Sequence, residues 1–106
     1  MAKVIWNKRA ELLFYEHIVY AQNEFGITTA LRWINQRSKI IARLRNYPES
    51  YSPEKLLKNR KRTYRAAIIM KNFKLIYAYF PTSGTVHIVD LWDMRMNPAS
   101  LRKRIR

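Results

Sequence analysis

Two side chains in the second half of this sequence, Arg65 and His87, have the chemistry needed to act on a phosphodiester. Arginine binds phosphate oxygens with its forked guanidinium, and histidine moves a proton near neutral pH. If the chain turns tightly at Lys71-Asn72 and closes a loop over Pro81 to Gly84, both side chains lie in one row across a sheet, on either side of Ala78. Neighbouring strands lie about 4.8 Å apart, so the two backbones are separated by roughly 10 Å, which a phosphodiester can span.

Three β-rich runs must position this row: Thr63 to Met70, Phe73 to Phe80, and Thr85 to about Trp92. Their spacing predicts an antiparallel meander. In the register of a tight turn, Met70 faces Phe73, and the helices cover that apolar face while Arg65 and His87 lie on the opposite one. A β-bulge near Asp90 would shift the pairing beyond it. The alternative interpretation is that Arg65 and His87 are only half-exposed strand residues.

The N-terminal residues predict one strand and one helix. Lys3 to Trp6 alternates polar and apolar residues, as a short strand does. Asn7 stands at the N-cap position of a helix of about four turns, in which apolar residues recur at spacings of three and four, and Gly26 ends it. His17 lies on that apolar stripe, so we expect a hydrogen-bonded core histidine rather than a ligand.

A second amphipathic helix follows, with Thr28 or Thr29 as its cap, and it stops before Pro48. The short link makes the two helices an antiparallel hairpin. Residues 49 to 62 are expected to form a loop, with one helical turn capped by Ser52. The element order β, α, α, β, β, β predicts a single α+β domain over residues 1–106. In it, an N-terminal β-strand and an α-helical hairpin pack on an antiparallel β-meander, followed by a short basic C-terminal segment.

Positive charge is concentrated in the second half of the chain. The sequence carries 21 Lys and Arg against 7 Asp and Glu, a net charge of +14. From Lys55 onward there are 13 Lys and Arg against only Asp90 and Asp93. A surface so rich in cations repels itself unless it meets a polyanion, which favours phosphate binding or an acidic protein partner.

Two runs carry most of this charge, KLLKNRKRTYR from Lys55 and SLRKRIR at the C-terminus. Lys and Arg neutralise phosphates and a tyrosine stacks on an unpaired base, so the first run fits RNA binding. The alternatives are a solvated loop and a disordered basic terminus. The candidate nucleic-acid-binding residues are Lys55, Lys58, Arg60, Lys61, Arg62, Tyr64, Lys74, Arg102, Lys103 and Arg104.

Composition excludes several other classes of site. The chain has no cysteine, which rules out disulfides and thiolate metal sites and fits a reducing cytoplasm. Two histidines and few carboxylates give no metal-ligand spacing, and two glycines cannot build a phosphate-binding loop, so no metal and no cofactor is expected. No apolar run is long enough to span a membrane, so we expect a cytoplasmic protein.

The segments FKLIY (residues 73–77) and TVHIVDLWDMR (85–95) are also similar to known sequences. Together with Trp6, Ala10, the helical hairpin and a basic strand before FKLIY, they resemble the RelE/ParE superfamily of bacterial type II toxins over nearly the whole chain. The resemblance implies a small cytoplasmic toxin, neutralised by an acidic antitoxin that wraps it, with the pair repressing its own operon. RelE-like members enter the ribosomal A site and cleave mRNA, whereas ParE-like members poison DNA gyrase.

The resemblance leaves three functions open. In an mRNA endonuclease, the 2'-hydroxyl attacks the adjacent phosphate, with Arg65 and neighbouring cations stabilising charge and His87 carrying the proton. Arg95, with Asp93 before it, resembles the arginine that ends the last strand in many ParE-like members. The usual C-terminal His or Tyr of the ribonucleases is absent, which favours a non-catalytic gyrase poison. A nucleic-acid-binding module without toxicity is the third possibility. The candidate catalytic residues are Arg65, His87 and Arg95.

Overall fold

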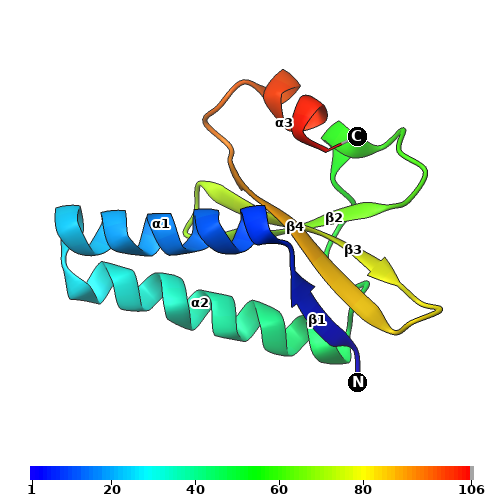
Figure 1. Ribbon diagram of the computed structural model, residues 1–106, viewed down its shortest axis with the longest axis horizontal. Coiled ribbons are helices and arrows are strands. Elements are labelled where there is room, and N and C mark those ends of the chain that lie inside the picture. The colour runs from blue at the N-terminus through cyan, green and yellow to red at the C-terminus, as the bar shows by residue number, and fades with distance from the viewer. Residues whose placement is uncertain (106) are drawn as a thin grey trace.

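The computed structural model describes residues 1–105 and has the predicted α+β architecture (Figure 1). A helical hairpin lies on one face of a four-stranded sheet, and a short C-terminal helix lies near a 3-10 turn at the other. The strand order is β1-β4-β3-β2. The elements are β1 (Lys3–Trp6), α1 (Lys8–Phe25), α2 (Ile27–Asn46), the 3-10 turn η1 (Lys55–Leu57), β2 (Tyr64–Ile69), β3 (Phe73–Phe80), β4 (Thr85–Asp93) and α3 (Pro98–Arg104).

The helix boundaries follow from local capping. Asn7 caps α1 as predicted, and its side chain accepts a hydrogen bond from the Ala10 N–H. Gly26 ends α1 with a φ of 94°, a conformation that glycine adopts without strain. The prediction that a threonine caps α2 is wrong, because Gly26 itself is the residue before α2 and the link has no room for another cap. The helix ends at Asn46, shortly before Pro48, as expected.

The sheet is mixed rather than purely antiparallel. β1 pairs in parallel with β4, with Ile5 beside His87, whereas β3 pairs antiparallel with both β2 and β4. The connection from β1 to β4 contains the hairpin α1–α2 as well as β2 and β3, so it is long enough for a parallel pairing. The register predicted for the β3–β4 hairpin is confirmed, since Ala78 faces His87. A bulge follows at Val89, so that Ile76 pairs with Asp90.

The predicted register of β2 on β3 is wrong by one residue. Ile69, not Met70, faces Phe73, and Tyr64, not Arg65, shares a row with Ala78. The cause is the loop, which holds Met70 and Lys71 at positive φ (53° and 66°) and has three residues instead of two. Because side chains alternate along a strand, this shift moves every β2 residue to the opposite face.

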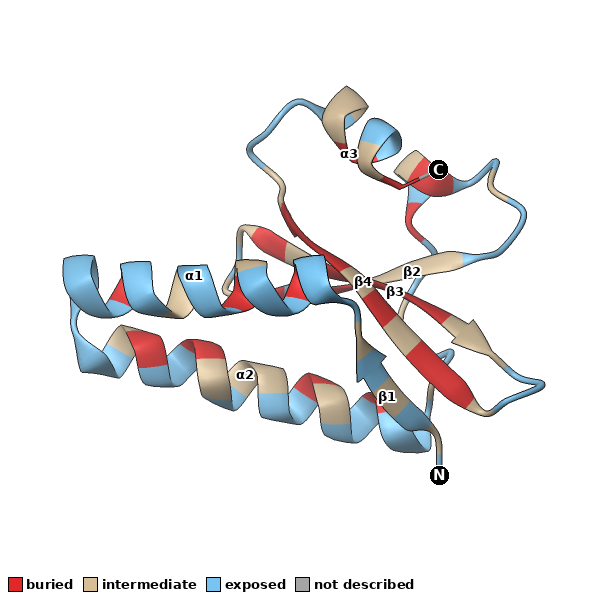
Figure 2. Ribbon diagram, in the orientation of Figure 1, coloured by how far each residue is buried: buried red, intermediate tan, exposed pale blue. Residues whose placement is uncertain are grey.

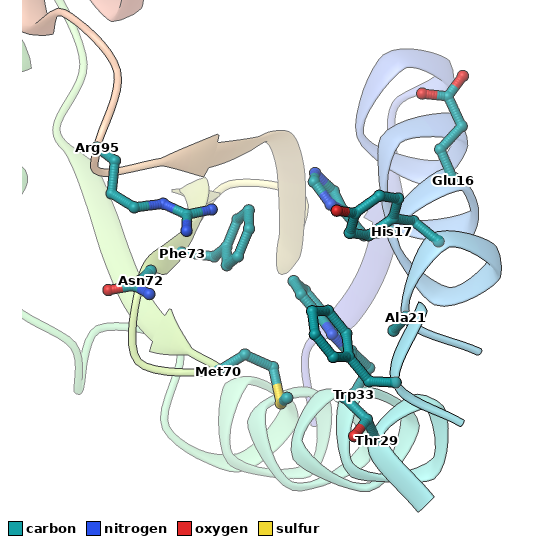
Figure 3. A pocket seen from close by; sticks show the side chains of 11 residues that line it. Glu16, His17, Ala21, Thr29, Trp33, Met70, Asn72, Phe73 and Arg95 are labelled. Carbon is teal, nitrogen blue, oxygen red and sulfur yellow. The ribbon is translucent and has the colours of Figure 1, made fainter. Parts of the chain in front are cut away.

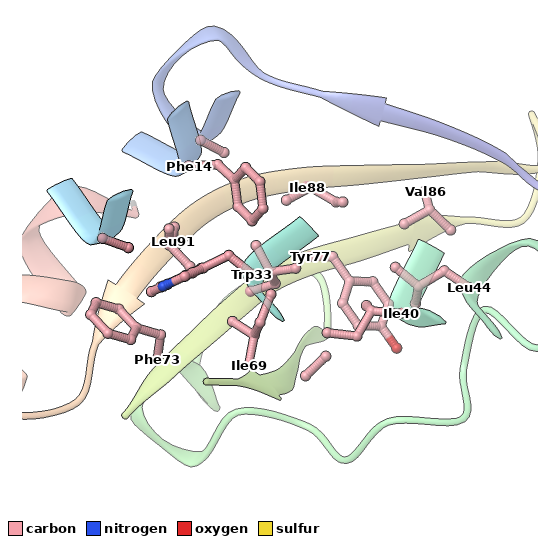
Figure 4. Packing of buried hydrophobic residues seen from close by; sticks show 14 residues of the cluster. Phe14, Trp33, Ile40, Leu44, Ile69, Phe73, Tyr77, Val86, Ile88 and Leu91 are labelled. Atoms are coloured by element: carbon pink, nitrogen blue, oxygen red, sulfur yellow. The ribbon is translucent and has the colours of Figure 1, made fainter. Parts of the chain in front are cut away.

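The main core lies between the helices and the sheet (Figures 2 and 4). Trp33 packs edge-on to Phe14 and Phe73, with ring centroids 5.9 and 4.8 Å apart. The sheet contributes alternate residues of β3 and β4, as a half-buried sheet should. Buried members of this core include Ala10, Phe14, Ala21, Trp33, Ile40, Leu44, Ala67, Ile69, Phe73, Leu75, Tyr77, Val86, Ile88 and Leu91.

A second core covers half of the other sheet face. η1 and α3 pack there, around Leu57, Ile76, Trp92, Leu101 and Ile105. The prediction that Ser52 caps the loop's helical turn is wrong. The side chain of Glu54 caps it instead, by accepting from the Leu56 N–H at 3.1 Å. The basic C-terminal segment is therefore a docked helix, and it leaves only part of this sheet face open.

Candidate functional site

The two basic runs meet in space although about forty residues separate them. Arg60 joins them, because its Nη2 donates to the carbonyl oxygens of Arg102 (2.8 Å) and Ile105 (2.9 Å). These carbonyls belong to the end of α3, where backbone acceptors lack helical partners. Arg60 is thus placed to hold α3 rather than a ligand. Around it, the exposed cations of the two runs are Lys55, Lys58, Lys61, Arg62, Arg102 and Lys103.

Four candidate cations are each paired with a carboxylate. Lys74 lies 2.7 Å from Glu54, which is 4% exposed, and Arg104 lies 2.6 Å from Asp90, which is fully buried. A buried carboxylate needs a partner of opposite charge. Lys74 and Arg104 supply that charge to Glu54 and Asp90, and so they stabilise the fold next to the second core. The other pairs are Arg65 with Glu49 at 3.6 Å and Arg95 with Asp93 at 2.9 Å.

Arg65 and His87 lie on opposite faces of the sheet, so the predicted row is not formed. Arg65 points to the helix side with Tyr77, and its Nη1 donates to the carbonyl oxygen of Tyr51 at 2.8 Å. The correction follows directly from the one-residue register shift of β2. The side chain that shares the row of Ala78 and His87 is Tyr64.

A cation and two rings form a continuous series on the part of the sheet that α3 leaves open. The guanidinium of Arg62 lies 4.5 Å from the centroid of the Phe80 ring. The imidazole of His87 lies 4.7 Å from the same ring, tilted by 56°. We call this surface the open patch; its members are Lys3, Ile5, Arg62, Tyr64, Ala78, Phe80 and His87.

Phe80 is the aromatic member of the open patch that was not predicted as a site residue, and Lys3, Ile5 and Ala78 were not predicted as site residues either. The signal was available, because the confirmed β3–β4 register places Phe80 on the face of His87 at the end of its strand. None of the seven side-chain carboxylates, all of which lie within residues 1–105, belongs to this patch: four are paired as above, and the other three, Glu11, Glu16 and Glu24, lie on α1. The open patch therefore combines aromatic rings with uncompensated positive charge.

Arg95 lies on the other side of the molecule, at a cavity of about 710 Å³ between the far end of the hairpin and the β2–β3 turn (Figure 3). Its guanidinium binds both carboxylate oxygens of Asp93, at 2.9 Å each, and lies over the Phe73 ring. The hydrogen bonds from Arg95 hold the pKa of Asp93 below its usual value. Arg95 thus shares a site with neither Arg65 nor His87.

His17 lines the same cavity and is half-buried against the aromatic rings of the main core, but its side chain makes no hydrogen bond within residues 1–105, so the expected hydrogen-bonded core histidine is confirmed only in its packing. Its ring stacks on Trp33, with centroids 5.4 Å apart and planes 8° apart, and it meets Phe73 edge-on. Burial lowers the pKa of His17, against the opposing influence of Asp93 and Glu16. The imidazole is therefore neutral in the folded protein at neutral pH.

The neutral state of His17 predicts a loss of stability on acidification. The unfolded chain takes up a proton near pH 6.5, whereas the folded chain resists it, so the free energy of unfolding falls as the pH drops below about 6.5. A His17→Phe variant keeps the stacking and is expected to flatten this fall between about pH 7 and pH 5. Urea unfolding at a series of pH values measures it. Equal slopes for the two proteins would contradict the assignment.

Among residues 1–105, no group of three or more His, Asp or Glu side chains is placed to hold a metal ion. Within the same residues, no helix is long and apolar enough to cross a membrane. The cations and rings described above can bind a partner through charge and stacking.

No protein-family model matches this sequence, and none of the curated proteins does. Among solved structures, the chain is similar to one described as "Chromosomal ParDE TA system from P. aeruginosa", with a TM-score of 0.67 and 11% sequence identity. The similarity covers 88% of this chain and 96% of that chain. At this identity the likeness establishes the fold, a helical hairpin on a four-stranded mixed sheet, shared with a component of a ParDE system.

Proposed function

We propose that this protein is the toxin of a bacterial type II toxin-antitoxin system. The observation that carries the proposal is the fold, which is shared over 88% of the chain with a component of a ParDE system. The resemblance of the FKLIY and TVHIVDLWDMR segments to RelE/ParE toxins supports it independently of the structure comparison. We also propose a cytoplasmic location, in keeping with a chain free of cysteine.

The proposed partner is an acidic antitoxin protein. Four of the seven carboxylates are already engaged by cations of the chain itself, yet the net charge is +14. The exposed cations Lys55, Lys58, Lys61, Arg62 and Arg102 around η1 and α3 pair with none of these four carboxylates, so a partner can neutralise them from outside. An acidic chain that wraps the toxin would supply this charge and keep the surface from its target.

For the target we favour ribosome-bound mRNA. In the proposed reaction the 2'-hydroxyl gives up its proton and attacks the adjacent phosphorus, the bond to the 5'-oxygen breaks, and that oxygen leaves with a proton, so that a 2',3'-cyclic phosphate remains. His87 would take up the first proton and donate one to the leaving oxygen, and Arg62 would stabilise the charge that develops on the phosphate oxygens. Arg62 replaces Arg65 in this role because it shares the open patch with His87 through Phe80.

DNA gyrase is the second candidate target. The observation that favours gyrase is that the three candidate catalytic residues lie in three separate places. A protein that only binds its target does not need these residues to lie together. In that case Arg95 and the basic α3 would contact the enzyme without any bond being cut. Both candidates make the protein a toxin, so one induction experiment tests both.

Induction in a sensitive bacterium is expected to arrest growth and to produce cleaved translated mRNA. His87→Ala should reduce cleavage by about 10²-fold or more, because a proton carrier in the transition state contributes at least that much. Arg65→Ala is the matched control and should cleave like the unmodified protein, since Arg65 lies on the opposite face. Transcript mapping and plasmid supercoiling are measured together.

The other outcomes are equally informative. Intact transcripts with altered supercoiling would replace mRNA cleavage by gyrase poisoning. Loss of cleavage in Arg65→Ala but not in His87→Ala would contradict the role of the open patch. If induction does not arrest growth, both toxin proposals fail. The basic surface then supports a nucleic-acid-binding module without toxicity.

A further inference from the structure

We infer that the open patch binds an unpaired base of single-stranded RNA, stacked on the ring of Phe80 next to Tyr64. The inference rests on the proposed action on RNA and extends it, because it names the chemical group that the surface recognises. It makes Phe80 a positioning residue, which would fix the strand while His87 and Arg62 act on a neighbouring phosphate.

The arrangement of the side chains favours stacking. Tyr64 and His87 lie on either side of Ala78 in one row, roughly 10 Å apart at the backbone. Ala78 carries only a methyl group and is buried, whereas Tyr64 and His87 beside it are half-buried, so the accessible surface of this row belongs to the two rings. Phe80 follows in the next position on the same face, in contact with His87. RNA-binding sheets use aromatic residues on neighbouring strands in this way, each ring stacking on one base.

The charge around the rings selects a polyanion rather than an apolar protein surface. The guanidinium of Arg62 lies over the Phe80 ring, so a base that stacks on this face takes its place and leaves Arg62 to contact a phosphate, and Lys3 lies beside Thr85 at the edge of the same face. Lys58 and Lys61 are exposed in the segment that leads to Arg62. Because no carboxylate belongs to this patch, nothing in it repels a phosphate backbone. Rings for the bases and cations for the backbone together fit single-stranded nucleic acid.

The position of α3 sets one border of the proposed site. α3 and η1 cover the rows of Ile76 and Trp92, whereas Phe80, His87 and Tyr64 are only half-buried. An extended strand can therefore reach the rings from the end of the sheet where β3 and β4 turn. Lys58 and Lys61, which are exposed in the segment before Arg62, would then contact further phosphates.

The test uses the purified full-length protein and a short, unstructured, fluorescently labelled oligoribonucleotide, together with a matched strand that lacks its bases. Phe80→Leu is expected to weaken binding of the intact strand about tenfold, the effect of losing one stacked base, and Phe80→Trp to restore it. On the strand without bases, the three proteins should bind alike. The dependence of affinity on salt should be unchanged, since the phosphate contacts remain.

Tyr79→Leu is the matched control, because Tyr79 is the neighbouring aromatic residue but faces the main core. It should bind RNA like the unmodified protein, and circular dichroism checks that all variants fold. Equal affinity of Phe80→Leu and the unmodified protein for the intact strand would overturn the inference. So would a loss of affinity that is the same with and without bases. If Phe80→Leu instead loses only an acidic protein partner, the patch is a protein-docking surface and the inference fails.

This result and the toxin proposal can fail separately. If induction arrests growth but binding at Phe80 does not depend on the bases, the inference is wrong and the proposed toxin function is still supported. Base-dependent binding without growth arrest would support the RNA site and reject the toxin.

Discussion

Replacing Arg104 with Ala is expected to lower the free energy of unfolding by about 3–5 kcal/mol, the usual cost of leaving a buried charge without its partner. Asp90 is fully buried, and its Oδ1 accepts a hydrogen bond from Arg104 at 2.6 Å. Its other oxygen has no hydrogen-bond partner within the described residues. Arg104 is thus the cation that hydrogen-bonds this carboxylate, while the backbone of Leu91 and the charge of Arg9 also favour its ionised form. Urea or thermal unfolding measures the effect.

Arg102→Ala is the control on the same helix. Arg102 is exposed, and only its backbone carbonyl is bonded to Arg60, so the substitution should change stability by no more than about 0.5 kcal/mol. Replacing both partners, as Asp90→Leu with Arg104→Met, should recover most of the loss, because no unpaired charge is then buried. Equal stability of Arg104→Ala and Arg102→Ala would show that the ion pair does not hold α3 on the sheet.

The pH dependence of the Arg104→Ala variant gives a second check. Burial raises the pKa of Asp90, and Arg104 opposes that shift. Without the arginine, the protonated carboxyl is favoured in the folded chain over the unfolded one. The variant should therefore regain stability as the pH falls from neutrality through the raised pKa of Asp90. A deficit that is independent of pH would point to lost packing of the Arg104 side chain instead.

Local signals in the sequence were sufficient for most of the fold. Asn7 and Gly26 marked both ends of α1, and Pro48 marked the end of α2. The alternation of apolar residues gave three strands within one or two residues of their bounds, and the loop of Pro81 to Gly84 gave the correct β3–β4 register. These features depend on residues close in sequence, where capping and turn preferences decide the conformation.

The β2–β3 register could not be predicted, because its loop breaks a local rule. Met70 and Lys71 both adopt positive φ, which residues with a Cβ rarely do, and a two-residue turn at Lys71-Asn72 was the simpler interpretation. The tertiary contact that accompanies the loop is distant in sequence: the Met70 N–H donates to the side chain of Gln36 on α2 at 2.7 Å. One residue of error here was enough to place Arg65 on the wrong face.

The candidate site was predicted only in part, for a similar reason. The sequence identified which residues are cationic but not which of them meet a carboxylate. Lys74 and Arg104 looked like ligand-binding groups until Glu54 and Asp90 were found against them. Such pairs join segments that are 14 to 20 residues apart, and no periodicity links them. Among the candidate residues, the exposed cations for a partner are therefore Lys55, Lys58, Lys61 and Arg62 near η1 and Arg102 on α3, rather than cations across the whole sheet.

Trp33→Ala is expected to be the other strongly destabilising substitution, at a cost of about 3–5 kcal/mol. Trp33 is 5% exposed and contacts the rings of Phe14, His17 and Phe73, so it joins α1, α2 and β3 in one aromatic cluster (Figure 4). Removing the indole leaves a cavity that these rigid rings cannot fill by small movements. Denaturant unfolding measures the loss.

Trp33→Phe separates the volume of the indole from its stacking. It keeps an aromatic face for His17 and should cost roughly half as much or less, because the smaller ring leaves a smaller void. The cavity of about 710 Å³ adjoins Trp33, so an alternative is that the neighbouring side chains collapse into the vacated space. In that case Trp33→Ala and Trp33→Phe would have similar stability. A large difference in the free energy of unfolding between the two variants would instead show that this cluster is rigid. The packed rings would then be what keeps the neighbouring cavity from collapsing.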